Sequence, residues 1–136
     1  MVIYLDSAAL VKLIRQEHAS ADLVAWLGER PGEALVSSAL VEVEVPRALR
    51  RAAPQALAGV PGVLTRLYRL EIDQTVRATA AAYADPALRS LDAVHLATAR
   101  LIAGQPGAEP LVFVTYDRRL LKTAEDAGLE VAAPGA

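Results

Sequence analysis

The 136-residue sequence contains no cysteine. This absence excludes disulfide bonds, thiolate metal sites and cysteine catalysis. Aromatic residues make up only 4% of the chain, so we expect a core built from Ala, Leu and Val. No apolar run approaches the roughly 18 residues that a membrane-spanning helix needs. Asp6 follows Val2–Leu5 too early for a signal peptide, and we therefore expect a cytoplasmic protein.

Several catalytic motifs are also missing. The chain has no G-x-S-x-G elbow and only two histidines, which argues against a serine hydrolase. Neither a P-loop nor a G-x-G-x-x-G sequence is present. Ser7 and Ala8 follow Asp6, so the D-x-D motif of haloacid-dehalogenase-type phosphatases is absent. The net charge of −2 argues against a protein that coats nucleic acid nonspecifically.

Short apolar runs alternate with segments of helical periodicity along the chain. A content of 54% hydrophobic and 22% charged residues excludes disorder and favours a single domain over residues 1–136. The predicted strands are Val2–Leu5, Ala34–Leu40, Tyr68–Ile72, Leu111–Thr115 and Leu129–Ala132. The predicted helices are Ser7–Glu17, Ser20–Arg30, a helix starting between Val41 and Val45 and running through Arg51, an interrupted segment within Gln55–Arg69, Thr75–Tyr83, Ser90–Ile102 and Arg118–Ala127. This alternation predicts a three-layer α/β/α domain with a mostly parallel central sheet of four to five strands.

The predicted helix ends have their own signals. Serine is a preferred N-cap residue, and Ser7, Ser20, Ser38 and Ser90 stand where helices are expected to begin. Gly128 follows the last predicted helix and is expected to end it in the left-handed conformation.

Four acidic residues stand where such a sheet would bring them together: Asp6, Glu44, Asp92 and Asp117. Two of them end strands and two lie in or near first helical turns. Because ligands gather at the carboxyl ends of parallel strands, we expect the four carboxylates to converge. At about 5 Å each pair repels by roughly 3 kcal/mol at an effective dielectric near 20. A cation such as Mg²⁺ or Mn²⁺ is the expected partner of such a cluster.

Each acid also has a simpler interpretation. Asp6 and Asp117 could cap the helices that follow them. The helix dipole alone favours Asp92 in a first turn. Glu44 could form a surface ion pair with Arg47, three residues further on.

Two further ambiguities concern neighbouring residues. Glu42 competes with Glu44, because residues two apart on a helix face about 200° away from each other and only one can enter the site. His95 shares a helix face with Asp92 and could ligate a metal, orient Asp92 or transfer protons, or simply pack. His18 has no partner motif and is expected at the surface.

Arginine dominates the basic residues, with 12 of 14. Its planar guanidinium suits bidentate phosphate contacts. A cluster at Arg47, Arg50 and Arg51 and the pair Arg118 and Arg119 lie close to the acids in sequence. They could be solvated helix faces with local ion pairs. We single out Arg47 and Arg118 as candidate RNA-phosphate contacts.

Four stretches of the chain resemble the motifs of PIN-domain ribonucleases, particularly VapC toxins. They are Tyr4–Leu13, Ser37–Leu40 followed by Glu44–Leu49, Leu91–Ala99 and Thr115–Leu120. They cover essentially the whole chain, in order and with family-like spacing. The resemblance therefore implies a PIN-like domain.

The resemblance assigns the four acids to a catalytic cluster. It selects Glu44 over Glu42, because the family's Glu precedes a stretch matched here by Arg47-Ala48-Leu49. Pro46 is an uncommon residue within that motif. Thr115 matches a small hydroxyl residue that supports the fourth acid, and Ser7 is a second supporting candidate. Mg²⁺ or Mn²⁺, an RNA substrate, homodimerisation and a cognate VapB-like antitoxin are also implied.

The expected function is that of a toxin of a type II toxin–antitoxin pair. It would hydrolyse RNA phosphodiesters with a metal-activated water, leave a 5′-phosphate and inhibit growth and translation. Asp6 and Asp92 are the first choices as metal ligands, completed by Glu44 and Asp117. A catalytically inactive RNA-binding or scaffold PIN-like protein is the alternative. A phosphotransfer receiver is disfavoured, because Asp6 has no adjacent acid and Lys122 is the sole late lysine.

Overall fold

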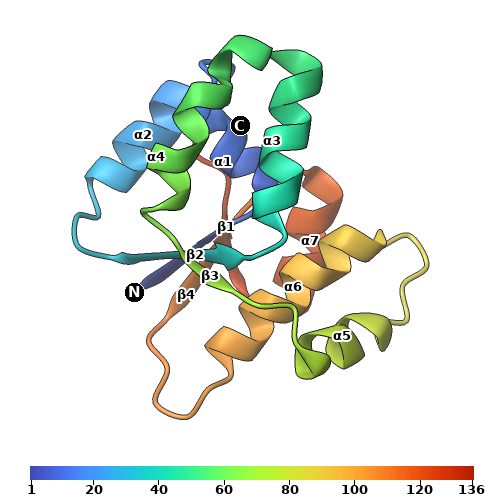
Figure 1. Ribbon diagram of the computed structural model, residues 1–136. Helices are drawn as coiled ribbons and strands as arrows, with labels where there is room; N and C mark the ends of the chain where they lie inside the picture. Colours follow the sequence, from blue (N-terminus) through green and yellow to red (C-terminus); the bar gives the residue numbers. More distant parts are fainter.

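The computed structural model describes residues 1–136, in which five strands alternate with helices (Figure 1). The strands are β1 (Val2–Leu5), β2 (Ala34–Ser38), β3 (Tyr68–Leu70), β4 (Leu111–Val114) and β5 (Glu130–Ala132). The helices are α1 (Ser7–Ile14), α2 (Ser20–Gly28), α3 (Val41–Ala52), the 3₁₀ helix η1 (Pro54–Gly59), α4 (Val60–Leu64), α5 (Gln74–Ala81), α6 (Ser90–Ala103) and α7 (Arg118–Asp126). The predicted elements are confirmed in kind and order, with shifted ends.

The sheet is parallel throughout, with the strand order β3-β2-β1-β4-β5. The strands β1, β2 and β3 follow one another toward one edge of the sheet, and β4 then pairs with the other side of β1. The order of connection therefore reverses between β1 and β4. In doubly wound sheets a crevice opens at this point, beyond the carboxyl ends of the strands.

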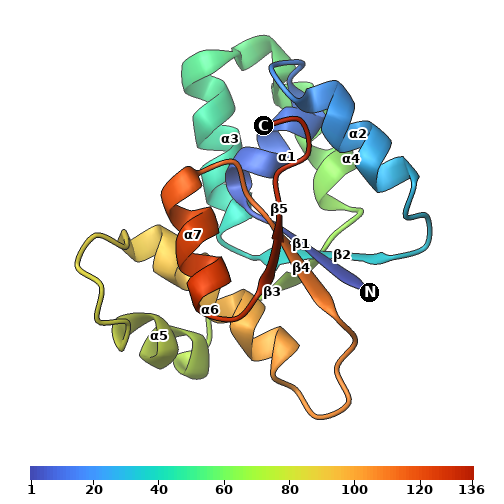
Figure 2. The ribbon, with the colours of Figure 1, turned by 180° about the vertical axis from the view of Figure 1, so that it is seen from behind.

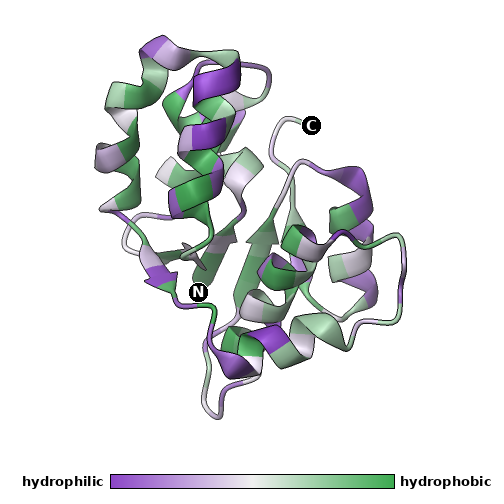
Figure 3. Cartoon of the chain, turned by 45° about the vertical axis from the view of Figure 1, so that its right-hand side comes forward, coloured by the Kyte–Doolittle hydropathy of each residue, from purple (hydrophilic) through white to green (hydrophobic).

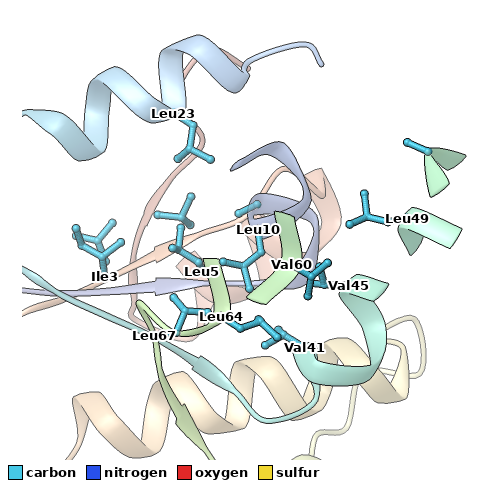
Figure 4. Packing of buried hydrophobic residues seen from close by; sticks show 14 residues of the cluster. Ile3, Leu5, Leu10, Leu23, Val41, Val45, Leu49, Val60, Leu64 and Leu67 are labelled. Atoms are coloured by element: carbon cyan, nitrogen blue, oxygen red, sulfur yellow. The ribbon is translucent and has the colours of Figure 1, made fainter. Parts of the chain in front are cut away.

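Helices cover both faces of the sheet, and β1 serves both layers with alternate residues. Ile3 and Leu5 pack with the layer of α1 to α4, as Figure 4 shows. Tyr4 packs with residues of α6 and α7, the helices of the opposite face, which Figure 2 shows from behind. The central strands carry mostly hydrophobic residues, whereas the helices carry both hydrophobic and polar ones (Figure 3). Each fully buried Leu or Ile stabilises the fold by about 1.5–3 kcal/mol. None of the helices combines the length and apolarity needed to cross a membrane.

The core is poor in aromatic residues, as expected, and its one aromatic stack lies at the centre of the sheet. Tyr4 on β1 and Phe113 on β4 are fully buried, with ring centroids 5.2 Å apart. Their stacking joins the two strands between which the topology reverses.

The prediction that serines cap the helices is wrong at all four positions. Ser7, Ser20 and Ser90 are each the first residue of a helix, so the cap lies one residue earlier. At α1 the cap is Asp6, whose side chain accepts a hydrogen bond from the Ala9 amide. A carboxylate accepts such a bond as well as a hydroxyl does, and the neighbouring acid therefore displaces Ser7 from this role.

Helix α3 begins at Val41, within the expected interval, but Pro46 lies in its second turn rather than its first. Proline has no backbone N–H, so the Glu42 carbonyl lacks its usual partner four residues ahead. Ser38 does not cap α3 directly; its hydroxyl accepts a hydrogen bond from the Leu40 amide, before the helix begins. Gly128 has φ +91° and ends α7 in the left-handed region, as predicted.

Candidate active site

All four acids lie near the edge of the sheet where the topology reverses. Asp6 directly follows β1, and Asp117 follows β4, the parallel neighbour of β1. The prediction that these two acids end adjacent strands is confirmed. Glu44 and Asp92 lie in the first turns of α3 and α6. Residues distant in sequence therefore meet because parallel strands end at a common edge.

Asp6 is buried, with 4% of its surface exposed. One carboxylate oxygen accepts the Ala9 amide at 3.0 Å, and the other accepts the Thr115 hydroxyl at 2.6 Å. Burial raises the pKa of Asp6, although His95 and these two donors act in the opposite direction; the negative charge of Asp92 raises it further. A nearby cation would relieve the cost of holding this carboxyl in its ionised form.

Thr115 connects two of the acids. While its hydroxyl donates to Asp6, the same oxygen accepts the Asp117 amide at 3.2 Å. Asp117 caps α7 by accepting the amides of Arg119 and Leu120 with Oδ1, at 2.9 and 3.1 Å. Its other oxygen, Oδ2, is left for a cation.

Arg89, the residue just before α6, provides that cation. Its Nη2 lies 3.0 Å from Asp117 Oδ2, and its Nε lies 3.1 Å from Asp92 Oδ2. The hydrogen bond to Asp92 and the charges of both acids raise the pKa of Arg89. One guanidinium therefore bridges two of the four candidate acids.

Glu44 makes a different contact from the predicted one. It forms no ion pair with Arg47; its Oε1 instead lies 2.7 Å from His95 Nε2. Glu42 points elsewhere and pairs with Arg69 of β3 at 3.5 Å. The two glutamates of α3 thus diverge as their spacing requires, and only Glu44 turns toward the other acids.

His95 is 1% exposed and lies between two partners, neither of which is Asp92. Its Nδ1 is 2.7 Å from the Tyr4 hydroxyl, and its Nε2 faces Glu44. Burial raises the pKa of Tyr4 well above its usual value, so the phenol stays neutral. With Nε2–H donating to the Glu44 carboxylate, Nδ1 accepts the Tyr4 proton. This chain of hydrogen bonds fixes Glu44 from the core.

The predicted tight convergence of carboxylates is not formed. Throughout residues 1–136, no group of three or more His, Asp or Glu side chains lies close enough together to hold a metal ion. The donors at this edge are nevertheless carboxylate oxygens, which suit Mg²⁺ or Mn²⁺. Asp92 and Asp117 already share one cationic group. The donor chemistry therefore suits a hard divalent cation, and binding one requires the carboxylates to move closer together.

The remaining candidates lie around these acids. Ser7 and Arg47 line a surface cavity together with Glu44, and Arg118 lines a second cavity with Asp92 and Asp117. Both arginines are exposed and form no ion pair. His18 is exposed, as expected.

Two residues of this network were missed by reasoning from sequence, although each had a signal. Arg89 precedes Asp92 by three residues, the spacing of neighbours on one helix face. Tyr4 precedes Asp6 by two residues, and alternate residues of a strand share a face.

Residues 3–126 match the model of the family described as PIN domain. The chain belongs to the PIN-domain family. It is 54% identical to "Ribonuclease VapC35" of Mycobacterium tuberculosis over 135 residues, with 98% of both chains covered. "Ribonuclease VapC47" of the same species is 36% identical, covering 99% of this chain and 98% of the relative. The expected resemblance to VapC-type PIN-domain toxins is confirmed.

Solved structures of this PIN domain's relatives share its fold. A chain of the structure described as VapBC2 from Rickettsia felis bound to a promoter DNA fragment superposes with a TM-score of 0.63 at 16% identity, covering 98% of this chain and 99% of that one. A chain of FitAB bound to a DNA fragment gives 0.59 at 18% identity, with 98% and 96% covered. The predicted three-layer α/β/α fold is confirmed.

Proposed function

We propose that this PIN domain is a Mg²⁺- or Mn²⁺-dependent endoribonuclease that acts as the toxin of a type II toxin–antitoxin pair. The observation that carries the proposal is the buried carboxylate of Asp6, held by Thr115 at the point where the sheet topology reverses. The other three acids follow β4 or lie in the first turns of α3 and α6 near the same edge. The 54% identity to a protein named a ribonuclease supports RNA as the substrate. We also propose that the protein acts in the cytoplasm.

The residues divide the chemistry among them. Asp6 and Asp92 are the proposed metal ligands, with Glu44 and Asp117 completing the set. When bound, the cation lowers the pKa of a water and neutralises charge on the phosphate. Glu44, held in place by His95, is positioned to accept a proton from the attacking water. Because no 2′-hydroxyl attacks, the product carries a 5′-phosphate.

Positive charge flanks the acids on two sides. Arg47 lies on the α3 side and Arg118 on the α7 side, and neither is engaged in an ion pair. We propose that they contact RNA phosphates on either side of the scissile bond. The guanidinium geometry suits this contact.

Expression of the chain alone is expected to arrest bacterial growth, and Asp92→Asn is expected to relieve the arrest. The substitution removes a proposed metal ligand while keeping the size of the side chain. Growth curves measure the arrest and its relief, and sequencing of 5′-phosphate RNA ends measures the cleavage. Asp126→Asn is the control, because Asp126 pairs with Lys122 on the surface of α7. Equal toxicity of folded Asp92→Asn would refute nuclease activity as the cause of arrest.

The proposed partner is a VapB-like antitoxin, and the toxin is proposed to act as a homodimer. The VapBC2 and FitAB structures support the first part, because their descriptions name paired proteins. We propose that the antitoxin lays a C-terminal segment along a groove beside the early helices. An arginine from this segment would bridge site carboxylates through charge-assisted hydrogen bonds.

The toxin–antitoxin complex is expected to bind Mn²⁺ more weakly than the free toxin. Replacing the inserted antitoxin arginine by Ala is expected to restore cleavage more than it weakens assembly, because apolar anchors remain. Calorimetric titration with Mn²⁺ and an RNA cleavage assay test this. A structure of the pair with every antitoxin residue far from Asp6 and Asp92 would contradict direct inhibition.

A further inference from the structure

Arg89 makes the only ion pairs formed by Asp92 and Asp117. It reaches one acid in the first turn of α6 and another at the cap of α7, through two different nitrogens. Asp117 has already committed Oδ1 to two backbone amides, so the oxygen that Arg89 occupies is the one left for any other cation. Arg89 therefore occupies the position that a divalent cation needs.

We infer that Arg89 is the resident counter-ion of this site, which yields the carboxylates to the entering metal and then contacts the RNA phosphate. The inference rests on the proposed metal-dependent nuclease function. It accounts for the orientation of two of the acids, because Asp92 and Asp117 each direct Oδ2 to the Arg89 guanidinium.

The contact is built to be released. The Arg89 side chain is 73% exposed, and ion pairs at such exposure contribute little because water screens them. A divalent cation carries twice the charge and binds oxygen at shorter distances, so it competes with the guanidinium for these oxygens. No buried group loses a partner when Arg89 moves, since both acids keep access to solvent.

The released side chain stays beside the reacting group. Arg89 is tethered three residues before Asp92 and lines the same cavity as Arg118 and Arg119. Its fork of donors matches a phosphate as well as it matches two carboxylates. Lysine would not substitute fully, because a single ammonium is a point charge without the fork.

Mn²⁺ titration calorimetry of the free toxin, without RNA, tests the counter-ion role. Arg89→Gln is expected to tighten Mn²⁺ binding by roughly threefold to tenfold, the range expected from losing weak exposed ion pairs. Arg89→Lys is expected to fall between the wild type and Arg89→Gln. Lys122→Gln is the matched control. Lys122 lines the same cavity but pairs with Asp126 and contacts neither Asp92 nor Asp117, so the Mn²⁺ affinity of this variant should equal that of the wild type.

RNA cleavage at saturating Mn²⁺ tests the phosphate role. Arg89→Gln is expected to lose at least about tenfold in kcat/KM although it binds metal more tightly. A structural defect would lower both the Mn²⁺ affinity and kcat/KM. A higher affinity together with a lower kcat/KM therefore distinguishes the proposed role from a folding defect. If the wild type bound Mn²⁺ and cleaved RNA, but Arg89→Gln bound Mn²⁺ with the same affinity as the wild type, the counter-ion role alone would be overturned. Undiminished cleavage by Arg89→Gln would overturn the phosphate role. If no variant bound Mn²⁺, the proposed metal site would fail, and this inference with it.

Discussion

Asp6→Asn is expected to lower the rate of RNA cleavage by about a thousandfold or more. The same substitution is expected to stabilise the metal-free protein at neutral pH. The substitution replaces a buried carboxylate by a neutral group of the same shape. The amide oxygen can still accept the Ala9 amide, and the Thr115 hydroxyl can turn to accept from the amide nitrogen. Activity and stability are therefore expected to change in opposite directions.

The pH dependence follows from the pKa of Asp6, which folding raises above its ordinary value of 3.8. The folded state thus binds this proton more tightly than the unfolded state does. The resulting stabilisation is fully present below the unfolded pKa and is lost as pH rises through the folded pKa. At neutral pH the burial of the ionised wild-type side chain costs stability, whereas the neutral amide of the Asp6→Asn variant carries no such cost. The stability advantage of Asp6→Asn should shrink as pH falls toward 4.

Thermal melts with and without millimolar Mn²⁺ provide the measurement. A ligand that binds only the folded state raises the melting temperature, so the wild type should shift upward and Asp6→Asn should not. Asp126→Asn, which removes an exposed acid of α7, should keep the wild-type shift. The same Mn²⁺ shift in Asp6→Asn and the wild type would exclude Asp6 as a ligand.

Glu44→Gln is expected to lower metal-dependent cleavage by about a hundredfold or more, while Glu42→Gln leaves it nearly unchanged. Glu44 accepts a hydrogen bond from buried His95, whereas Glu42 is 47% exposed and pairs with Arg69. The two substitutions are chemically identical and lie in the same helical turn, so each controls for the other. Steady-state cleavage of one RNA under both Mg²⁺ and Mn²⁺ measures the ranking. The reverse ranking would mean that α3 presents its other face to the substrate.

Much of the fold could be predicted from the sequence because the relevant physics is local. Continuous apolar runs such as Leu111–Val114 indicate strands buried on both faces, and their alternation with helices implies parallel pairing. The positions of Asp6 and Asp117 at strand ends followed from the same pattern. Helix caps were harder to predict, because two candidate residues such as Asp6 and Ser7 stand side by side and only geometry decides between them.

The contacts within the site depended on long-range geometry. His95 lies 51 residues from Glu44 and 91 from Tyr4, and nothing in its own helix indicates either partner. Arg89 is near Asp92 in sequence, but its contact with Asp117 depends on how α6 and α7 approach each other. Mutual repulsion among the acids is consistent with their separate partners: Arg89 pairs with Asp92 and Asp117, whereas Glu44 contacts His95.

The hydrogen bond between Thr115 and Asp6 spans 109 residues, which sets the order in which the site is assembled. The first acid leaves the ribosome early, but β4 and Asp117 must follow before Asp6 acquires its neighbours. At ordinary speeds of synthesis, roughly ten seconds separate the two ends of the site. The growing chain therefore carries no assembled nuclease beside the messenger RNA and ribosome that produce it. If the chain is the toxin proposed above, its antitoxin would have that interval in which to be present before the first complete site forms.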